Sequence, residues 1–177
     1  MHKIIWLIRK IVLMFIFSNK RLIGINFINE IGKHIIVIIK RKGKVRILGK
    51  LNMRHNVIIN VNGGLLQLGD NVFINSFSSI NSQKNIIIGN EVLIGEGVRI
   101  YDHDHDYKSY GVKRKNSFSA SDVIIGNGVW ICSNAVILKG TVIGDNAVIA
   151  AGAIVKGNVP AGVIYISKNK HKKIFTH

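Results

Sequence analysis

The chain has 177 residues, 47% of them hydrophobic, which is enough for one domain with a buried core. Its single cysteine, Cys132, excludes an internal disulfide framework and agrees with a reducing compartment. The formal net charge of +16 favours an anionic partner, such as a polyanion or an anionic membrane surface. Aromatic residues are few and are not interleaved with the basic residues, so we do not expect nucleic acid as the partner.

The N-terminal segment is basic and apolar. Its two apolar runs, 4–8 and 11–17, are separated by Arg9 and Lys10, and neither approaches the roughly 20 residues of a membrane-spanning helix. No small-residue signal-peptide cleavage site follows. We expect a helix that either packs on the domain and its neighbours or lies at a membrane surface, anchored by Trp6 and Phe17.

A six-residue repeat dominates the rest of the chain. From Ile125 the sequence reads IGNGVW, ICSNAV, ILKGTV, IGDNAV, IAAGAI and VKGNVP. Earlier hexads begin at Leu68 and Ile88, with a two-residue phase slip between Ile80 and Ile88. A period of six fits neither an α-helix nor a simple hairpin strand. It predicts a parallel β-helix, in which three short strands form each coil and the first residues of the hexads stack inward.

Residues 101–121 interrupt the repeat, and we expect a loop over 101–122 that protrudes from one corner. It begins with two histidines, His103 and His105, among three aspartates at 102, 104 and 106. Loops on rigid scaffolds often carry chemistry. A neutral imidazole can take a proton from an alcohol as the alcohol attacks an acyl group, and a neighbouring carboxylate can fix the imidazole tautomer.

The hexads at 68–100 and 125–160, together with DHDHD at 102–106 and NGVW at 127–130, resemble the hexapeptide-repeat acyltransferases. Within that family they are most similar to the galactoside, maltose and bacterial-polysaccharide O-acetyltransferases. The resemblance implies an all-β fold, a left-handed parallel β-helix with an N-terminal helical segment and a protruding active-site loop. The expected parts are the helix and lead-in strands (1–45), the β-helix (46–163) and a basic tail (164–177).

The resemblance also implies transfer of an acetyl group from acetyl-CoA to a sugar hydroxyl in surface-polysaccharide biosynthesis, without a metal. The resemblance implies a homotrimer with sites between adjacent chains. We expect the protein in the cytoplasm, where its N-terminal helix would contact the inner face of the membrane. His105 matches the general base of the family. The residues expected beside the acceptor are Asn75, His103, Asp104 and Trp130, and those expected along the coenzyme are Trp130, Ser133, Ala151, Lys156 and Lys172, with Lys139, Lys168 and Lys173 as further cations.

Three alternatives stay open at this stage. A zinc-dependent hydratase, as among hexapeptide-repeat carbonic anhydrases, would use the His-x-His pair as ligands. An N-acetyltransferase acting on an amino-sugar nucleotide would use the same base. A non-catalytic protein of the same fold is the third, because the tail VPAGVIYISKNKHKKIFTH lacks the G-N-P-A segment of the relatives and leaves their adenine-end contacts in doubt.

Overall fold

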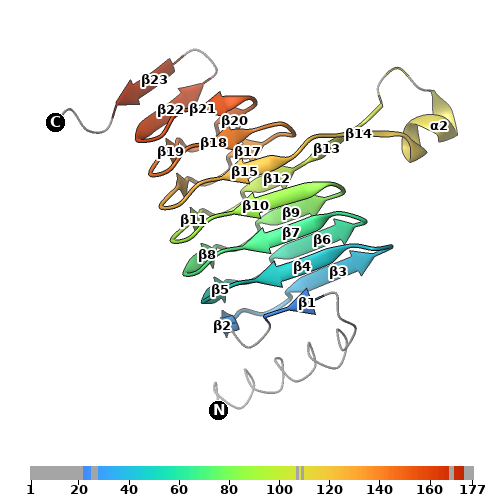
Figure 1. The fold of residues 1–177 in the computed structure, drawn as a ribbon, viewed down its shortest axis with the longest axis horizontal. Coiled ribbons are helices and arrows are strands. Elements are labelled where there is room, and N and C mark those ends of the chain that lie inside the picture. Colours follow the sequence, from blue (N-terminus) through green and yellow to red (C-terminus); the bar gives the residue numbers. More distant parts are fainter. Residues whose placement is uncertain (1–21, 25–27, 107, 109, 168–169, 174–177) are drawn as a thin grey trace.

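The computed structural model describes residues 22–24, 28–106, 108, 110–167 and 170–173. Within them, short parallel strands form a β-helix, as the hexads predicted, and it is left-handed, as the resemblance implied. In Figure 1 the chain crosses the near side from right to left along β4, β7 and β10, returns behind along β6 and β9, and climbs toward the C-terminus, which is a left-handed course. The helix expected in the N-terminal segment falls on residues 1–21, outside the described residues.

Three sheets form the sides of the coil. In the described residues, sheet A contains β1 (Leu22–Ile23), β4 (Lys44–Ile47), β7 (Leu65–Leu68), β10 (Asn85–Ile88), β15 (Val123–Ile125), β18 (Val142–Ile143) and β21 (Asn158–Val159). Sheet B contains β2 (Ile28–Ile31), β5 (Leu51–Met53), β8 (Val72–Ile74), β11 (Leu93–Ile94), β16 (Trp130–Ile131), β19 (Val148–Ile149), β22 (Val163–Ser167) and β23 (Lys170–Lys173). Sheet C contains β3 (Ile36–Lys40), β6 (Ile58–Asn62), β9 (Ser79–Ser82), β12 (Arg99–Tyr101), β17 (Val136–Ile137) and β20 (Ile154–Val155). We call the three stacks of corners the A–B, B–C and C–A edges, after the sheets that they connect.

The strand register explains the phase slip in the repeat. Ile124 is in register with Val142, so a coil near the C-terminus takes 18 residues, or three hexads. Leu66 is in register with Ile86, so a coil nearer the N-terminus takes 20. The two additional residues, 83 and 84, lie at the C–A edge between β9 and β10. The slip therefore marks an enlarged corner, and the coils before it are larger still, with 21 residues from Val45 to Leu66 and 22 from Ile36 to Ile58.

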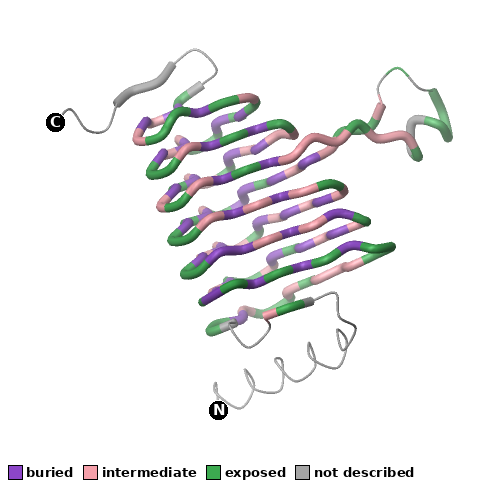
Figure 2. Tube along the Cα trace, viewed as in Figure 1, coloured by how far each residue is buried: buried purple, intermediate pink, exposed green. Residues whose placement is uncertain are grey.

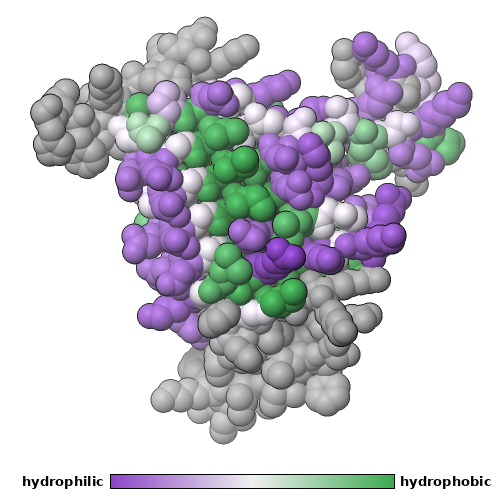
Figure 3. All heavy atoms as spheres, viewed as in Figure 1, coloured by the Kyte–Doolittle hydropathy of each residue, from purple (hydrophilic) through white to green (hydrophobic). Residues whose placement is uncertain are grey.

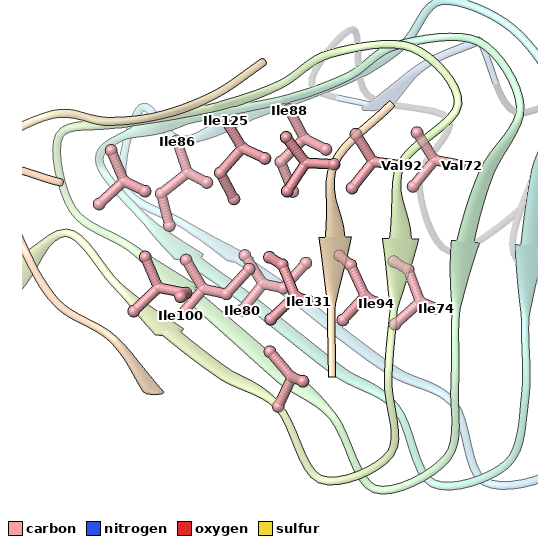
Figure 4. Close-up of a cluster of buried hydrophobic side chains, with 14 of the residues drawn as sticks. Val72, Ile74, Ile80, Ile86, Ile88, Val92, Ile94, Ile100, Ile125 and Ile131 are labelled. Carbon is pink, nitrogen blue, oxygen red and sulfur yellow. The ribbon is translucent and has the colours of Figure 1, made fainter. Parts of the chain in front are cut away.

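The core is a set of stacked aliphatic columns. Ile74, Ile94 and Ile131 are in register along sheet B and are each no more than 1% exposed (Figure 4). Buried residues alternate with more exposed ones along most strands of the coil (Figure 2), because successive side chains of a strand point to opposite faces. Since each coil is too short to bury its own apolar face, stacking supplies the stability.

Side-chain oxygens also connect the coils along the A–B edge. Asp70 Oδ1 accepts a hydrogen bond from the Lys50 backbone N–H at 2.7 Å. In the same way Asn90 accepts from Asp70, Asn127 from Asn90, and Asp145 from Asn127, each at 2.8 Å. These bonds satisfy backbone N–H groups at corners where the strand ladder is interrupted.

An arm leaves the C–A edge after β12, confirming the predicted protruding loop (Figure 1). It consists of β13 (His103–His105), helix α2 (Gly111–Asn116) and β14 (Phe118–Ala120), and β13 pairs antiparallel with β14. The loop is thus a hairpin with a short helix near its tip. The hexads could not predict this, because the segment has no repeat.

The coil extends on both sides of residues 46–163. Strands β1 to β3 precede residue 46, and β22 continues beyond 163 to pair antiparallel with β23 at the end of sheet B. Part of the expected C-terminal tail is therefore a hairpin that closes this sheet. Among the described residues, no helix has the length and apolar character needed to cross a membrane.

Candidate active site

The arm is anchored by a buried carboxylate at its root. Asp102 follows β12 directly and is 0% exposed. Its oxygens accept hydrogen bonds from the Ser82 hydroxyl at 2.8 Å and from the backbone N–H groups of Gln83 and Lys84 at 2.8 and 2.7 Å. These donors belong to the enlarged corner of the preceding coil, so the two-residue slip builds a cradle for Asp102.

The same carboxylate orients His103. Asp102 Oδ1 lies 2.9 Å from His103 Nδ1, and the His103 side chain is 16% exposed. Burial by itself raises the pKa of the Asp102 carboxyl, but the hydrogen bonds from His103, Gln83, Lys84 and Ser82 together hold this pKa below its ordinary value. An ionised carboxylate only accepts hydrogen bonds, so His103 Nδ1 carries the hydrogen, and Nε2 of a neutral ring is then available as a base.

Both histidines lie on one face of the arm. Residues i and i+2 of a strand share a face, which places the side chains of His103 and His105 together and that of Asp104 opposite. Phe118, paired with His105 across the hairpin, has its ring centroid 4.5 Å from that of His105 and 5.6 Å from that of His103. Phe118 was not predicted as a site residue, because its segment has no repeat and carries no motif.

Asp104 has a structural partner on the other face. Its Oδ2 lies 3.2 Å from Lys139 Nζ, and the same ammonium donates to the Ser119 carbonyl at 3.2 Å. Lys139 lies in the next coil toward the C-terminus, after β17. The arm is thus tied to the coil on both sides, by Asp102 to one coil and by Lys139 to the next. In this structure Lys139 holds the arm, rather than standing as an unpaired cation for a coenzyme phosphate.

Three other predicted residues lie along the B–C edge. Asn75 follows β8, Ser133 follows β16 and Ala151 follows β19, so they occupy equivalent corners of stacked coils. The Gly152 backbone N–H donates to the Ser133 carbonyl at 2.9 Å, which connects two of these corners. Asn75 Oδ1 accepts a hydrogen bond from the Ser76 N–H at 2.8 Å. Ser133 and Ala151 are small residues in neighbouring coils, whereas the coil between Asn75 and Ser133 carries the exposed Glu96 at this edge.

Trp130 lies outside the coil, on sheet B. Its side chain is 50% exposed and is in register with Leu93, 48% exposed, and with the half-buried Val148. The ring is therefore an accessible apolar platform, suited to the face of a sugar or to an extended thioester arm.

One chain does not bring all predicted residues together. The histidines lie at the C–A edge and Asn75, Ser133 and Ala151 at the B–C edge, at opposite ends of sheet C. Strand β9 alone separates these edges by roughly 13 Å, from four residues at about 3.3 Å each. Lys156 follows β20 at the C–A edge, away from Ser133 and Ala151, and Lys172 belongs to β23 beside β22.

Possible metal ligands and the cysteine were the other candidates for chemistry in the part of the chain that is described. In it, no three His, Cys, Asp or Glu side chains are grouped to hold a metal ion. Cys132 is partly buried, and burial raises the pKa of its thiol, which disfavours the nucleophilic thiolate.

Comparison with known proteins agrees with this fold. The model of the bacterial transferase hexapeptide (six repeats) family matches residues 122–157. WbbJ of Escherichia coli K12, which its name assigns to lipopolysaccharide biosynthesis as an O-acetyl transferase, is 30% identical over 109 residues. That match covers 57% of this chain and 56% of WbbJ, so the chain spans just over half the length of this curated relative.

Two solved structures have the same coil. A maltose O-acetyltransferase from Clostridium difficile 630 is 27% identical, with a TM-score of 0.53 over 85% of this chain and 72% of its own. AntD, an N-acyltransferase from Bacillus cereus solved as a point mutant with dTDP and coenzyme A, is 17% identical, with a TM-score of 0.74 over 93% of this chain and 87% of its own. The repeat and coil define a hexapeptide-repeat protein with a left-handed β-helix. Together with these relatives, they confirm the resemblance to the hexapeptide-repeat acyltransferases.

Proposed function

We propose that the protein is an acetyl-CoA-dependent O-acetyltransferase that modifies a sugar hydroxyl during bacterial surface-polysaccharide biosynthesis. The observation that carries the proposal is the pair of imidazoles, His103 and His105, held on one face of an arm that a buried carboxylate roots in the coil. The names of WbbJ and of the maltose enzyme describe the same reaction class for those proteins.

The reaction needs a base but no covalent enzyme intermediate. His105 accepts the proton of the acceptor hydroxyl while the oxygen attacks the thioester carbonyl. The C–S bond then breaks, the sulfur leaves as thiolate, and the imidazolium returns its proton to the sulfur. A backbone N–H holds the negative charge that develops on the carbonyl oxygen. Trp130 packs against the acceptor or the pantetheine, and the line of Asn75, Ser133 and Ala151 supports both substrates.

His103 is the alternative base, and one specific contact favours it. Its Nδ1 is 2.9 Å from the Asp102 carboxylate, an arrangement that fixes the tautomer and stabilises the imidazolium. His105 lies closer to Phe118 and is more exposed, as a residue that meets an incoming acceptor should be. Separate alanine variants of the two histidines distinguish these roles.

We further propose a homotrimer in which the arm of one chain meets the B–C edge of its neighbour. The separation of the predicted residues within one chain supports this arrangement. So do the outward residues Ile87, Ile124 and Val142, which are in register along sheet A. Ile124 is 43% and Val142 40% exposed, and Figure 3 shows hydrophobic side chains gathered along the middle of the near face, where sheet A lies, with hydrophilic side chains on both sides. A neighbouring chain would cover this apolar stripe.

Mixed oligomers test the shared site. Chains carrying His105→Ala lack the base, and chains carrying Ala151→Trp have a blocked coenzyme line but an intact arm. If the two edges meet across the interface of a trimer, an equimolar mixture refolded together regains about a quarter of the wild-type activity, because one arm–edge combination in four is intact. No recovery in the mixture, with each variant inactive alone, would place the whole site within one chain.

The reaction itself is tested by thiol release from acetyl-CoA against sugars, nucleotide sugars and bacterial polysaccharides. Amino-sugar nucleotides in the same panel distinguish the N-acetyltransferase alternative. We expect the protein to act in the cytoplasm, at the inner membrane face where lipid-linked glycans are built. Absence of both turnover and coenzyme A binding would favour the non-catalytic alternative.

A further inference from the structure

The three edges of the coil differ sharply in charge. All nine acidic residues of the chain are described. None lies at the C–A edge between β3 and β10, and the four that belong to this edge, Asp102, Asp104, Asp106 and Asp122, lie further along, on the arm and at its root. The same stretch of edge carries exposed cations, which are Lys40, Arg41, Lys42, Lys44 and Lys84.

The other two edges carry fewer cations over the same coils. There the A–B edge has Asp70 beside Lys50. The B–C edge has two cations, Lys33 and Arg54, and its first acidic residue, Glu96, lies beyond β10. The net charge of +16 is therefore not spread evenly, and its densest described line runs along the C–A edge below the arm.

This basic line leads to the histidines. The corner at residues 40–44 lies three coils below the root of the arm, a distance of about 14 Å at about 4.8 Å per coil. Arg41 reaches along the line, since its Cδ lies 3.9 Å from the position that a Cβ on Gly63 would occupy in the next coil. Lys84 Nζ, at the arm root, lies 3.4 Å from Asp122 Oδ1.

A ladder of polar side chains runs beside the basic line. Asn60, Asn81 and Tyr101 are in register on the outer face of sheet C, next to the C–A edge, and all three are partly exposed. An amide can donate to one sugar oxygen and accept from another, and a tyrosine ring can pack against a sugar face. Tyr101 immediately precedes Asp102, so the ladder ends at the arm.

We propose that the basic line and the Asn60–Asn81–Tyr101 ladder form a binding track for an anionic saccharide chain, which leads an acceptor hydroxyl to the histidine pair. This inference rests on the proposed acetyltransferase function and specifies its substrate class as a carboxylated or phosphorylated glycan. The shape of the track favours a linear saccharide over a membrane. It is a narrow line of cations and amides that ends at the candidate base, whereas a membrane contact would use a broad face with apolar anchors.

Binding measured by calorimetry tests the track without requiring turnover. The probes are a hexamer of galacturonic acid, with one carboxylate per sugar, and the neutral maltohexaose. We expect the wild type to bind the anionic hexamer and not the neutral one, and to bind it more weakly as salt increases. In the double variant Lys40→Glu/Lys42→Glu the dissociation constant of the anionic hexamer should rise at least about tenfold, because two attractive contacts become repulsive.

The matched control is Lys33→Glu/Lys50→Glu, which changes the net charge equally on the other two edges. It should alter binding by less than about threefold, since these side chains lie away from the track. Equal loss in both double variants, or equal binding of the two hexamers by the wild type, would overturn the track. Loss of binding to phosphatidylglycerol vesicles in the track variant, with saccharide binding retained, would also overturn it and assign the line to the membrane.

Thiol release from acetyl-CoA separates this inference from the proposed function. If the wild type releases no thiol with any acceptor, and only the track variant loses hexamer binding, the track is supported and the acetyltransferase function is refuted. Thiol release that is equal in the track and control variants at limiting anionic acceptor would refute the track and leave the acetyltransferase standing.

Discussion

The buried carboxylate at the arm root gives the sharpest structural prediction. Asp102→Asn keeps the shape of the side chain but removes its charge and one of its two acceptor oxygens. Three donors, the Ser82 hydroxyl and the Gln83 and Lys84 N–H groups, point at the carboxylate from 2.7 to 2.8 Å. An amide oxygen at the Oδ2 position keeps the bonds from Ser82 and Lys84, but the Gln83 N–H, which lies 2.8 Å from Oδ1 and 3.0 Å from Oδ2, keeps only the longer of its two contacts.

The cost follows from these contacts. Hydrogen bonds to a charged group contribute about 1 kcal/mol more than neutral ones, and three of them lose the charge. The weakened Gln83 bond adds about 1 kcal/mol, so we expect a loss of about 4 kcal/mol in the free energy of unfolding. In a chain of this length each kcal/mol shifts the melting temperature by roughly 2–4 °C, which predicts a decrease of about 8–16 °C.

Thermal unfolding followed by circular dichroism measures this decrease at pH 7. The control is Asp104→Asn, two residues along the arm, where a half-exposed carboxylate pairs with Lys139. A pair that exposed contributes about 1 kcal/mol or less, so this variant should melt within a few degrees of the wild type. If Asp102→Asn also melts within 2–3 °C, the carboxylate does not anchor the arm, and the reasoning from its hydrogen bonds is wrong.

Three further predictions follow from the coil and its corners. Since hydrogen bonds lower the pKa of Asp102 in the folded chain, its contribution to stability is present above the unfolded pKa of about 4 and is lost as pH falls through the lower, folded pKa. Urea unfolding should then show the gap between wild type and Asp102→Asn narrowing below about pH 4, and a constant gap would contradict the linkage. Ile94→Ala should lose about 2–5 kcal/mol, because Ile74 and Ile131 are fixed in register on either side and cannot fill the cavity, whereas the half-exposed Leu93→Ala should lose about 1 kcal/mol or less. Gly89→Ala should destabilise the coil by more than Gly152→Ala, because a Cβ on Gly89 would lie 2.8 Å from the Gly126 backbone carbonyl. A Cβ on Gly152 meets no atom within 4 Å, so that change costs only the roughly 1–2 kcal/mol of a left-handed backbone at φ 70°. Equal melting temperatures would show that the A–B corner can shift to accept the Cβ on Gly89.

The coil was predictable because its constraint is local and repeated. Each hexad places one branched side chain in the interior, so residues such as Ile125 and Ile131 reveal their burial by spacing alone. The phase slip before Ile88 also had a physical cause, the corner that cradles Asp102. The slip is visible in the sequence, but the hydrogen bonds that its corner donates to Asp102 are not, because Asp102 lies about 20 residues further along the chain.

The arm was predictable only as an interruption. The pairing of His105 with Phe118, and the contact of Lys139 with Asp104, join residues that no repeat relates. The positions of Asn75 and Ser133 on the opposite edge from the histidines could be derived only once the hexads were assigned to the three sheets. For the same reason, residues that a family motif groups together turn out to lie about one strand length apart in a single chain.

Acetyl transfer by an imidazole on the arm is the central claim, and one assay tests it most directly. Thiol release from acetyl-CoA with an acceptor glycan should fall about 10²–10⁴-fold in His105→Ala, as for a lost general base, and should largely persist in His103→Ala. Collapse in His103→Ala with activity retained in His105→Ala would move the base to the histidine that Asp102 orients. Full activity in both variants would contradict the account.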